Sequence, residues 1–388
     1  MLQLLESLML GGYQICFACA AKPSPYAEDL ESMGIAVCPI KLNHPSFNTF
    51  LQSIKPDIVL YDRFMTEEQF GWRVSQECPQ ALTILDTEDL HLLRYARKES
   101  VKKNTDIDLY NPISKRELAS ILRCDLSLII SQAELQLLQD TFQVPASLLW
   151  YIPFMEEALS ADAFKQFPAF EHRKHFMFIG NYLHEPNVDA VETLRKEVWP
   201  ILRKKLPNSE LHIYGAYVTP HIQQMHKPEE GFIVKGRATH ARNTLSAYRM
   251  LLAPLRFGAG LKGKFLDAIH AGTPSLTTTI GAEGIGGAEQ WAGVICKDYS
   301  DMIQQALCLY ADKTLWKQAQ VRGIRINNTC FGKSYFQQAF VQKLRKLQQT
   351  ISAHRKQHFL GEIMRMDTIN SKKYMSLWIQ EKNQSPDN

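Results

Sequence analysis

The sharpest chemical signal in the sequence is a glycine-containing turn between two predicted elements. The segment reads Pro254-Leu-Arg-Phe-Gly-Ala-Gly-Leu-Lys-Gly-Lys-Phe-Leu-Asp267, after an apolar run and before a helical pattern that starts around Leu261. Glycines let a ligand approach the backbone, and free N–H groups at a helix N-terminus bind anions. Lys262 and Lys264 add positive charge where the helix dipole disfavours it, which favours a bound phosphate. A tight turn with two solvated lysines is the structural alternative.

Two further features of the second half fit the same chemistry. Asp267 lies one helical turn beyond Lys264 and can accept hydrogen bonds from ribose hydroxyls, although an i,i+3 pair with Lys264 fits the spacing equally well. The segment Phe178-Ile-Gly-Asn-Tyr-Leu-His-Glu-Pro-Asn187 predicts a strand, a loop and a helix. Gly180 and Asn181 would then stand at the strand end, where open α/β sheets bind ligands. An ordinary connecting loop is the alternative.

A polar cluster follows a predicted strand in the first half of the chain. The segment Leu85-Asp-Thr-Glu-Asp-Leu-His-Leu-Leu-Arg94 brings three carboxylates and His91 to one strand end. Histidine can act as a general acid or base near neutral pH, but a histidine near a helix start is more often structural. Asp62 and Arg63 end another predicted strand and are expected at the same edge.

Short apolar runs recur along the chain, each followed by a longer amphipathic stretch. Their hydrophobicity is continuous rather than alternating, which indicates strands covered on both faces and hence parallel sheets. The predicted strands are 14–21, 34–42, 57–62, 81–86, 126–131, 148–153, 175–180, 210–215, 232–236, 249–254, 274–279 and 294–297. Two successive series predict two doubly wound α/β domains. We place them at residues 1–155 and 156–332, and predict a C-terminal helix and a polar, basic tail over 333–388.

The first domain is expected to lack its first strand. A doubly wound domain normally opens with a strand and a glycine-rich turn. This chain instead opens with a helical pattern over residues 2–10, which Gly11 and Gly12 close. The absence of that strand would expose the edge of a neighbouring strand.

Bulk properties describe an ordinary globular protein. The 388 residues are 45% hydrophobic and 22% charged, and this length predicts two domains. The net charge of +4 requires no nucleic-acid partner. No basic signal-peptide start and no run of about 18 apolar residues is present, so we expect a cytoplasmic protein. The eight cysteines form no zinc-site pattern and are expected to be reduced thiols.

The motifs together resemble a known enzyme family. The second-half segments that carry the resemblance are Phe178-Ile-Gly-Asn, Pro186-Asn187, Leu211-His-Ile-Tyr-Gly215, Val234-Lys-Gly-Arg237, Ala253-Pro-Leu-Arg256, Gly258–Pro274 and Gly281-Ala-Glu-Gly284. From about residue 173 to 330, the chain resembles the nucleotide-sugar-binding domain of family 4-type (group 1) glycosyltransferases. The segments Tyr61-Asp-Arg63, Glu67-Glu-Gln-Phe-Gly-Trp72 and Leu85–Arg94 resemble the N-terminal domain of a bacterial branch of these enzymes.

The resemblance implies a fold, a reaction and a set of site residues. It implies a GT-B fold, in which two Rossmann-like domains face a cleft, and transfer from a nucleotide-sugar donor with retention and without a metal or other cofactor. The implied diphosphate contacts are Gly258, Gly260, Arg256, Lys262 and Lys264. Asp267 would face the ribose or sugar, the loop at Lys235, Gly236 and Arg237 would face the base, and His91 would lie near the reacting sugar.

One departure from the family pattern concerns the donor sugar. The family's paired glutamates would fall at Ala259 and Asp267, so the first carboxylate is lost and the second is shortened. Backbone groups of the Gly-Ala-Gly turn are the expected substitute. A noncatalytic nucleotide-sugar-binding or scaffold protein is therefore the main alternative to a transferase, and sugar-nucleotide epimerisation is a third.

The sequence leaves the acceptor open among sugars, lipids and proteins, because acceptor loops carry the least pattern. Polysaccharide or glycolipid assembly is the expected setting by family analogy. The basic stretch Lys343–Lys356 is a candidate for peripheral contact with the inner membrane, although a solvated helix face fits its pattern better.

Overall fold

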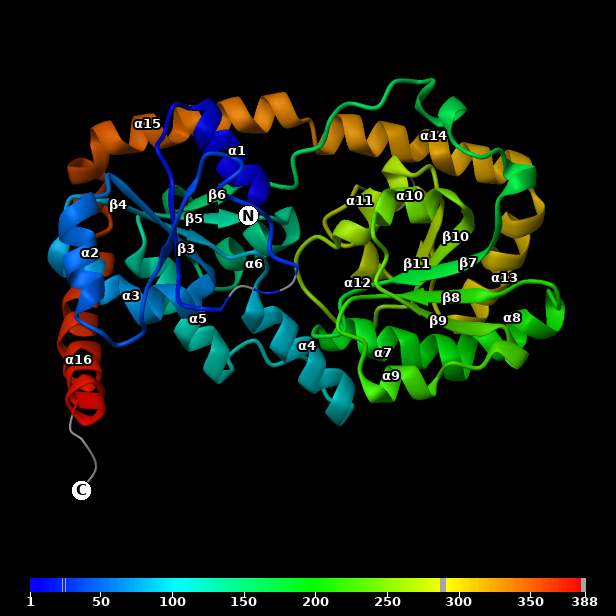
Figure 1. Ribbon diagram of the computed structural model, residues 1–388, viewed down its shortest axis with the longest axis horizontal. Coiled ribbons are helices and arrows are strands. Elements are labelled where there is room, and N and C mark those ends of the chain that lie inside the picture. Colours follow the sequence, from blue (N-terminus) through cyan, green and yellow to red (C-terminus); the bar gives the residue numbers. More distant parts are fainter. Residues whose placement is uncertain (23, 25, 287–290, 385–388) are drawn as a thin grey trace. The chain divides into compact units, whose positions relative to one another are not determined.

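The chain folds into two compact units. The computed structural model describes residues 1–22, 24, 26–286 and 291–384. Unit 1 comprises Met1–Leu92, Tyr110–Ile152 and Ser334–Asn388, and unit 2 comprises Leu93–Leu109 and Pro153–Lys333. Unit 1 is thus assembled from three separate stretches of the chain. Figure 1 labels most of the helices and strands of both units.

Unit 1 holds two parallel sheets. A four-stranded sheet has the order β3 (Ile58–Asp62), β4 (Leu82–Asp86), β5 (Leu126–Ile129) and β6 (Leu149–Tyr151). A separate pair joins β1 (Cys16–Cys19) to β2 (Ala36–Pro39). Every residue of β4 and β5 is buried, as expected for strands covered on both faces.

The helices of unit 1 surround these sheets, and α3 packs on β3 and β4. They are α1 (Leu2–Leu10), α2 (Ser46–Ile54), α3 (Arg63–Glu77), α5 (Pro112–Arg123), α6 (Gln132–Asp140), α15 (Lys333–Gln357) and α16 (Phe359–Gln384). Helix α1 matches its predicted range. The expected C-terminal tail is helical up to Gln384, and α16 packs against α3 and α5.

A buried carboxylate ties the last two helices to the sheet of unit 1. Asp125, at the start of β5, is 1% exposed. It accepts hydrogen bonds at 2.8 Å from Arg355 on α15 and from Arg365 on α16, and at 2.9 Å from the backbone and hydroxyl of Thr83. Burial alone would raise the pKa of Asp125, but the two guanidinium groups and the Thr83 donors hold it below its usual range.

Unit 2 is a doubly wound domain with one six-stranded parallel sheet. The strand order is β12 (Gly293–Ile295), β11 (Ser275–Thr277), β10 (Tyr248–Ala253), β7 (Lys174–Ile179), β8 (Leu211–Tyr214) and β9 (Phe232–Gly236). Its helices are α7 (Glu185–Thr193), α8 (Trp199–Lys205), α9 (Pro220–Gln224), α10 (Ala241–Ser246), α11 (Gly263–His270), α12 (Thr279–Ala282), α13 (Tyr299–Ala311) and α14 (Lys313–Cys330). A π-helical segment, Leu194–Val198, joins α7 to α8. Helix α4 (His91–Lys103) contributes its residues from Leu93 onward.

The observed strands follow the predicted ones. In the described part of the chain, each of the twelve strands lies within one residue of its predicted range, and every pair of these strands is parallel. Parallel strands end at a common edge, so the loops after β7, β8, β9 and β10 gather at one side of unit 2. That edge carries most of the predicted site residues.

Replacing the buried carboxylate should destabilise unit 1. We expect Asp125→Asn to lower the free energy of unfolding by about 3–5 kcal/mol near pH 7, because two guanidinium groups would lose their charged partner. A carboxylate with a lowered pKa stabilises the fold above its unfolded pKa, and this contribution disappears as the pH falls through the folded pKa. Calorimetric unfolding of wild type and variant from pH 7 to pH 3 should therefore show a shrinking difference.

The matched control is Asp162→Asn, which removes an exposed pair with Lys165. We expect a change within about 0.5 kcal/mol. Equal effects of the two variants would contradict the role given to Asp125.

Candidate functional site

The turn between β10 and α11 contains two glycines whose backbone conformations suit glycine. Gly258 has φ of +149° and Gly260 has φ of +63°, and both angles are unfavourable for other residues. Ala259 between them is buried. Lys262 caps the helix, and its ammonium group donates to the Gly260 carbonyl at 2.9 Å. Helix α11 therefore begins at Gly263, two residues later than the predicted start at Leu261.

Lys264 is a desolvated cation beside this turn. Its ammonium group donates to Oδ1 of Asn187 at 2.7 Å and lies 4.3 Å from the centre of the Phe178 ring. Among the described residues, no carboxylate forms an ion pair with it, so the predicted alternative of a pair with Asp267 is not formed. Burial, with a smaller contribution from Lys262, lowers the pKa of Lys264 to about 7. An anion bound here would restore the charged form.

The loop after β7 approaches this lysine through Asn187. The Asn187 amide donates to the Asn181 carbonyl at 2.8 Å, and Oδ1 of Asn181 accepts from the Leu183 amide at 2.8 Å. A Cβ on Gly180 would lie 2.6 Å from Cγ of Asn187, and a Cβ on Gly215 would lie 2.2 Å from the Gly180 carbonyl oxygen. Only glycine fits at either strand end. The predicted Gly180–Asn181 loop and the Lys264 turn thus meet in one place.

The loop after β9 continues the same edge. The Gly215 amide donates to the Gly236 carbonyl at 2.8 Å, and Gly236 has φ of +76° with open space where a Cβ would stand. Lys235 and Arg237 on either side are exposed. The three predicted residues of this loop therefore lie at the carboxyl edge of the sheet.

Two predicted site residues are held by ion pairs. Arg256 makes a two-pronged ion pair with Asp189 of α7. Asp267 accepts from Nε of Arg242 at 2.9 Å, and the same arginine donates to both oxygens of Glu156 at 3.0 Å. Both side chains are engaged by an oppositely charged partner, and no spacing in the sequence predicts these distant partners.

Arg97 on α4 contacts the candidate site, and the sequence motifs did not include it. Its guanidinium donates to the Gly258 carbonyl at 2.9 Å and to the two oxygens of Glu283 at 2.7 and 2.8 Å. Burial would raise the pKa of Glu283, but pairing with Arg97 lowers it. The arginine therefore connects the glycine turn to the Gly281-Ala-Glu-Gly284 segment. No local spacing links α4 to a turn about 160 positions later.

His91 lies in unit 1, and the other predicted site residues lie in unit 2. Its Nδ1 is 3.1 Å from the Asp89 carbonyl and 3.6 Å from Oε1 of Glu117. Glu117 also accepts from the amides of His91 and Leu92, so it caps the first turn of α4. The ring stands edge-on to Phe64. Its partners fix the orientation of the imidazole, and its side chain is 12% exposed.

The polar cluster predicted around His91 is present at the ends of β3 and β4. Burial and the nearby charge of Glu88 raise the pKa of Asp86 to about 7. Arg63 and Glu88 have φ of +67° and +59°, which is uncommon for residues other than glycine. Such backbone strain concentrates at functional sites.

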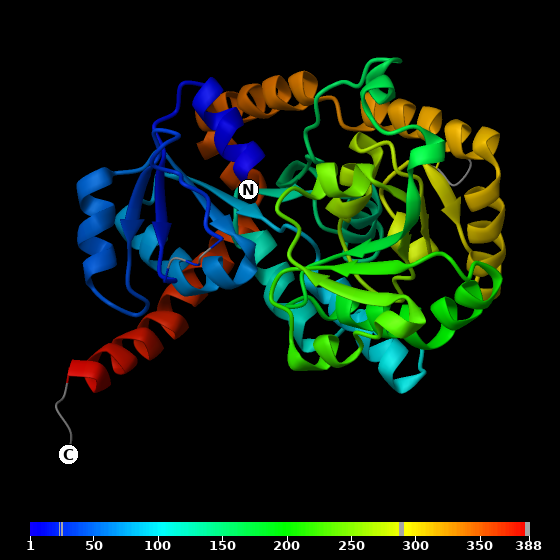
Figure 2. The ribbon, with the colours of Figure 1, turned by 45° about the vertical axis from the view of Figure 1, so that its right-hand side comes forward.

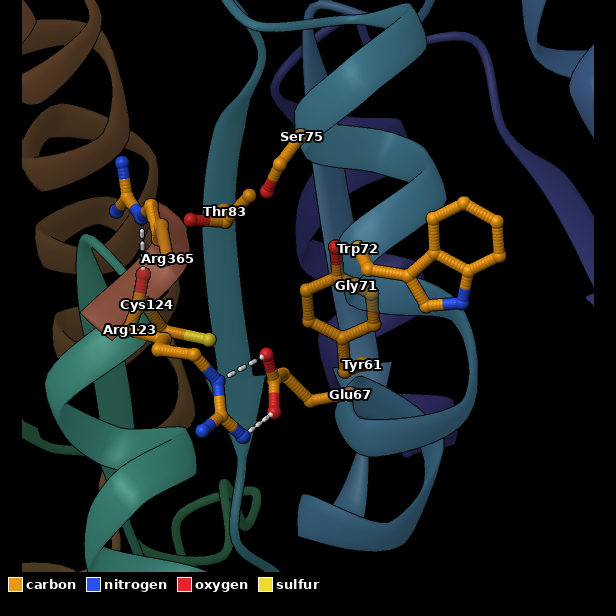
Figure 3. Close-up of a pocket in the computed structure, with 9 residues that line it drawn as sticks. All are labelled: Tyr61, Glu67, Gly71, Trp72, Ser75, Thr83, Arg123, Cys124 and Arg365. Atoms are coloured by element: carbon orange, nitrogen blue, oxygen red, sulfur yellow. Dashed lines mark hydrogen bonds and ion pairs between the residues drawn. The ribbon is translucent and has the colours of Figure 1, made fainter. Parts of the chain in front are cut away.

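A cavity in unit 1 does not qualify as a substrate site. Figure 3 shows its lining, including Tyr61 and the ion pair between Glu67 and Arg123. Its volume is about 10 Å³, close to the least that admits one water molecule. The Tyr61 hydroxyl is buried without a hydrogen-bond partner, which a water could supply. We assign the cavity to internal packing.

Residues 173–312, which include the glycine turn, Lys264, Asn187 and Glu283, match the family model described as "Glycosyl transferases group 1". Over these residues the chain is similar to the group 1 glycosyltransferases. This finding confirms the predicted resemblance to group 1 glycosyltransferases, and the matched region contains all six described strands of the unit 2 sheet.

Solved structures confirm the predicted GT-B fold. Sucrose-phosphate synthase from Thermosynechococcus elongatus matches with a TM-score of 0.63 and 14% identity, over 89% of this chain and 92% of that one. HepE from Anabaena, in complex with UDP and glucose, matches with a TM-score of 0.62 and 11% identity, over 88% and 95%. TarM from S. aureus matches with a TM-score of 0.58 and 13% identity, over 78% of this chain but only 58% of the TarM chain.

Among curated proteins, no sequence matches the chain. Within the described ranges, none of the helices has the length and apolar character needed to cross a bilayer. The same residues contain no group of three or more His, Cys, Asp or Glu side chains arranged to hold a metal ion.

The lowered pKa of Lys264 predicts a pH-dependent stability. Between pH 7 and about 10 the folded lysine is neutral while the unfolded one is protonated, so the unfolded state binds more protons and stability rises with pH. Lys264→Met lacks this contribution. We expect the melting temperature of the wild type, relative to that of Lys264→Met, to increase from pH 7 to pH 9.5. Calorimetry of both proteins across this pH range is the measurement. The exposed control Lys204→Met should track the wild type, and parallel curves for Lys264→Met would contradict the assignment.

Proposed function

We propose that the protein transfers a sugar, with retention of configuration, from a nucleotide-sugar donor to a sugar, lipid or protein acceptor. The observation that carries the proposal is the Lys264 ammonium group. It is desolvated, has no carboxylate partner among the described residues and stands beside a glycine turn at the carboxyl edge of a parallel sheet. A charged group in such surroundings is costly unless an anion joins it. A nucleotide diphosphate supplies that anion.

The site would act by stabilising the leaving diphosphate. Lys264 and Lys262 would neutralise its growing negative charge while amides of the Gly258–Gly260 turn donate hydrogen bonds. Arg97 and Asn187 would act as positioning residues, because one holds the turn and the other holds the lysine. Loss of one charged hydrogen bond to phosphate costs about 1.5–3 kcal/mol, roughly a ten- to hundred-fold weakening.

We propose a uridine nucleotide as the first donor to test. HepE was solved with UDP and glucose, and TarM with UDP. The loop of Lys235, Gly236 and Arg237 would contact the base. Arg256 would reach the diphosphate, and Asp267 the ribose or sugar, only after exchanging Asp189 and Arg242 for the ligand.

We further propose that transfer needs no metal or other cofactor, that nucleic acid is not a partner and that the reaction takes place in the cytoplasm in polysaccharide or glycolipid assembly. Contact with the inner membrane through Lys343–Lys356 remains part of this proposal. The proposals on cofactor and cellular setting rest on the family resemblance.

A noncatalytic nucleotide-sugar-binding protein is the second candidate. Ala259 stands where the family has a carboxylate, and the carboxylate of Asp267 is engaged by Arg242. Both features weaken contacts to the donor sugar and leave the diphosphate contacts intact. Donor binding without turnover would favour this candidate.

Donor binding should depend on Lys264. We expect calorimetry to detect binding of UDP or a UDP-sugar to the wild type, and Lys264→Met to weaken it ten- to hundred-fold. The control Lys204→Met should bind as the wild type does. Unchanged affinity in Lys264→Met would refute the phosphate assignment, and GDP- and ADP-sugars in the same assay would identify the nucleotide.

Turnover should depend on His91. General acid–base or positioning roles contribute about 10²- to 10⁴-fold, so His91→Gln is expected to reduce kcat at least a hundred-fold while donor affinity stays within twofold. Donor hydrolysis and transfer, with and without EDTA, are the measurements. If His91→Gln turns over normally at an unchanged melting temperature, the histidine only packs against Phe64 and Glu117.

A further inference from the structure

Helix α16 is turned the opposite way from an ordinary surface helix. Such a helix directs its apolar side chains to the core and its polar side chains to solvent. Near the C-terminal end of α16, Ser376 is only 5% exposed. Tyr374, Met375 and Trp378 around it are 69%, 65% and 63% exposed, and Leu377 is 38% exposed. The side chains that usually pack inside a protein therefore face solvent here.

Polar contacts with the rest of unit 1 fix this orientation. The Ser376 hydroxyl donates to Oδ1 of Asn43 at 3.1 Å and accepts from Arg73 of α3 at 3.4 Å. Arg365, earlier in the same helix, donates to Asp125 at 2.8 Å. Because both sets of contacts lie on the inner side of α16, a rotation that buried its apolar side would break them.

The exposed apolar side chains are neighbours on the helix. Tyr374 lies three positions before Leu377 and four before Trp378, and Met375 lies three before Trp378. We call these four residues the α16 surface. Figure 1 and Figure 2 both show this red end of α16 extending beyond the other helices of unit 1. Clustered exposed apolar side chains, unlike scattered ones, mark an interaction site.

The two C-terminal helices also carry the positive charge of the chain. Residues 333–384 contain ten Lys or Arg and three Asp or Glu, so their net charge is +7 while the rest of the chain has −3. An excess of five positive charges remains when Arg355 and Arg365, which are already ion-paired, are set aside. The ammonium group of Lys382 lies 5.4 Å from the centre of the Trp378 ring. This charge attracts an anionic partner and repels a second copy of the same surface.

We propose that the α16 surface docks on an anionic lipid membrane. Its aromatic side chains and Leu377 would enter the boundary between head groups and acyl chains, where tryptophan and tyrosine are favoured. Lys373 and Lys382 on the same helix would stay at the lipid phosphates. A helix with aromatic and leucine side chains on one side and lysines beside them lies in the plane of such a boundary. The inference rests on the proposed membrane contact of the protein, but it places the apolar part of that contact on α16.

The basic stretch Lys343–Lys356 does not supply this apolar part. Its leucines, Leu344 and Leu347, are buried, and none of the large exposed apolar side chains in the described part of the chain belongs to this stretch. Charge alone attracts a protein to a membrane only within a Debye length, and salt weakens the attraction. Apolar side chains inserted from α16 would add binding that salt does not remove.

Vesicle binding of the full chain tests the proposal. We expect the wild type to cosediment with vesicles of phosphatidylcholine and phosphatidylglycerol in equal parts, and Leu377→Ser/Trp378→Ser to bind at least about tenfold more weakly. The matched control, Leu315→Ser/Val321→Ser, removes two exposed apolar side chains from α14 and should bind as the wild type does. All four positions are exposed, so the melting temperatures should stay unchanged.

The charged part of the contact has its own variant. Lys373→Gln/Lys382→Gln should weaken binding by about fivefold per lysine, and high salt should remove this difference. Vesicles of phosphatidylcholine alone should bind the wild type more weakly than the mixed vesicles do.

Trp378 supplies an optical test of insertion. It is the most exposed of the six tryptophans. Lipids that carry bromine on their acyl chains quench the fluorescence of a tryptophan that enters them. We expect such quenching in the wild type and its loss in Trp378→Phe, which keeps an aromatic side chain and should still bind.

Three results would overturn the proposal. The first is wild-type binding of Leu377→Ser/Trp378→Ser to the mixed vesicles, or equal binding of the wild type to neutral vesicles. The second is a dimer, seen by sedimentation velocity, that the same variant abolishes while vesicles bind neither protein, because the α16 surface would then cover a second copy.

The third is loss of vesicle binding in Lys343→Gln/Lys346→Gln while Leu377→Ser/Trp378→Ser still binds. That outcome would reject α16 and leave the proposed contact at Lys343–Lys356 standing. Binding is measured without donor, so failure of the transferase proposal would leave these results unaffected.

Discussion

The parallel direction of every strand is the constraint on which the rest of the molecule depends. Parallel strands covered on both faces are mostly apolar, and open α/β sheets bind ligands at the carboxyl ends of their strands. Gly180, Gly215 and Gly236 allow the backbones to approach each other there. The glycine turn after β10 completes this edge. Its position at the carboxyl edge of the sheet, as well as its own sequence, makes this turn the candidate binding site.

Lys264 gives that edge its electrostatic character. Its ammonium group lies over the Phe178 ring and is held by an amide oxygen rather than by a carboxylate. Arg256, in contrast, already has a carboxylate partner, Asp189. The sequence motif predicts phosphate contacts for both Lys264 and Arg256. In the structure only Arg256 has a carboxylate partner that a bound anion would have to replace. A desolvated, weakly held charge gains most from a ligand, because part of the cost of removing water has already been met in the folded state.

The sequence predicted what depends on local pattern. Continuous apolar runs gave the strands, and the glycine turn and the Gly180–Asn181 loop were found from strand-end chemistry. The partners of Arg97, Asp267 and Arg256 were not predictable, because an ion pair between distant segments leaves no periodicity or spacing. The donor contacts, the role of His91 and the domain boundaries stay predictions. Whether Asp267 meets a ribose or only Arg242 depends on which interaction is stronger once a ligand is bound.

The anchoring of α15 and α16 at Asp125 has a consequence for the order of folding. Unit 1 needs residues from both ends of the chain, whereas most of unit 2 is one continuous stretch. During synthesis from the N-terminus, the carboxylate of Asp125 is made more than 200 residues before its arginine partners. Unit 2 can therefore complete its sheet first. Until Arg355 and Arg365 have been synthesised, Asp125 at the start of β5 lacks its two cationic partners. Folding of unit 1 is therefore completed only when α15 and α16 pack onto its sheet.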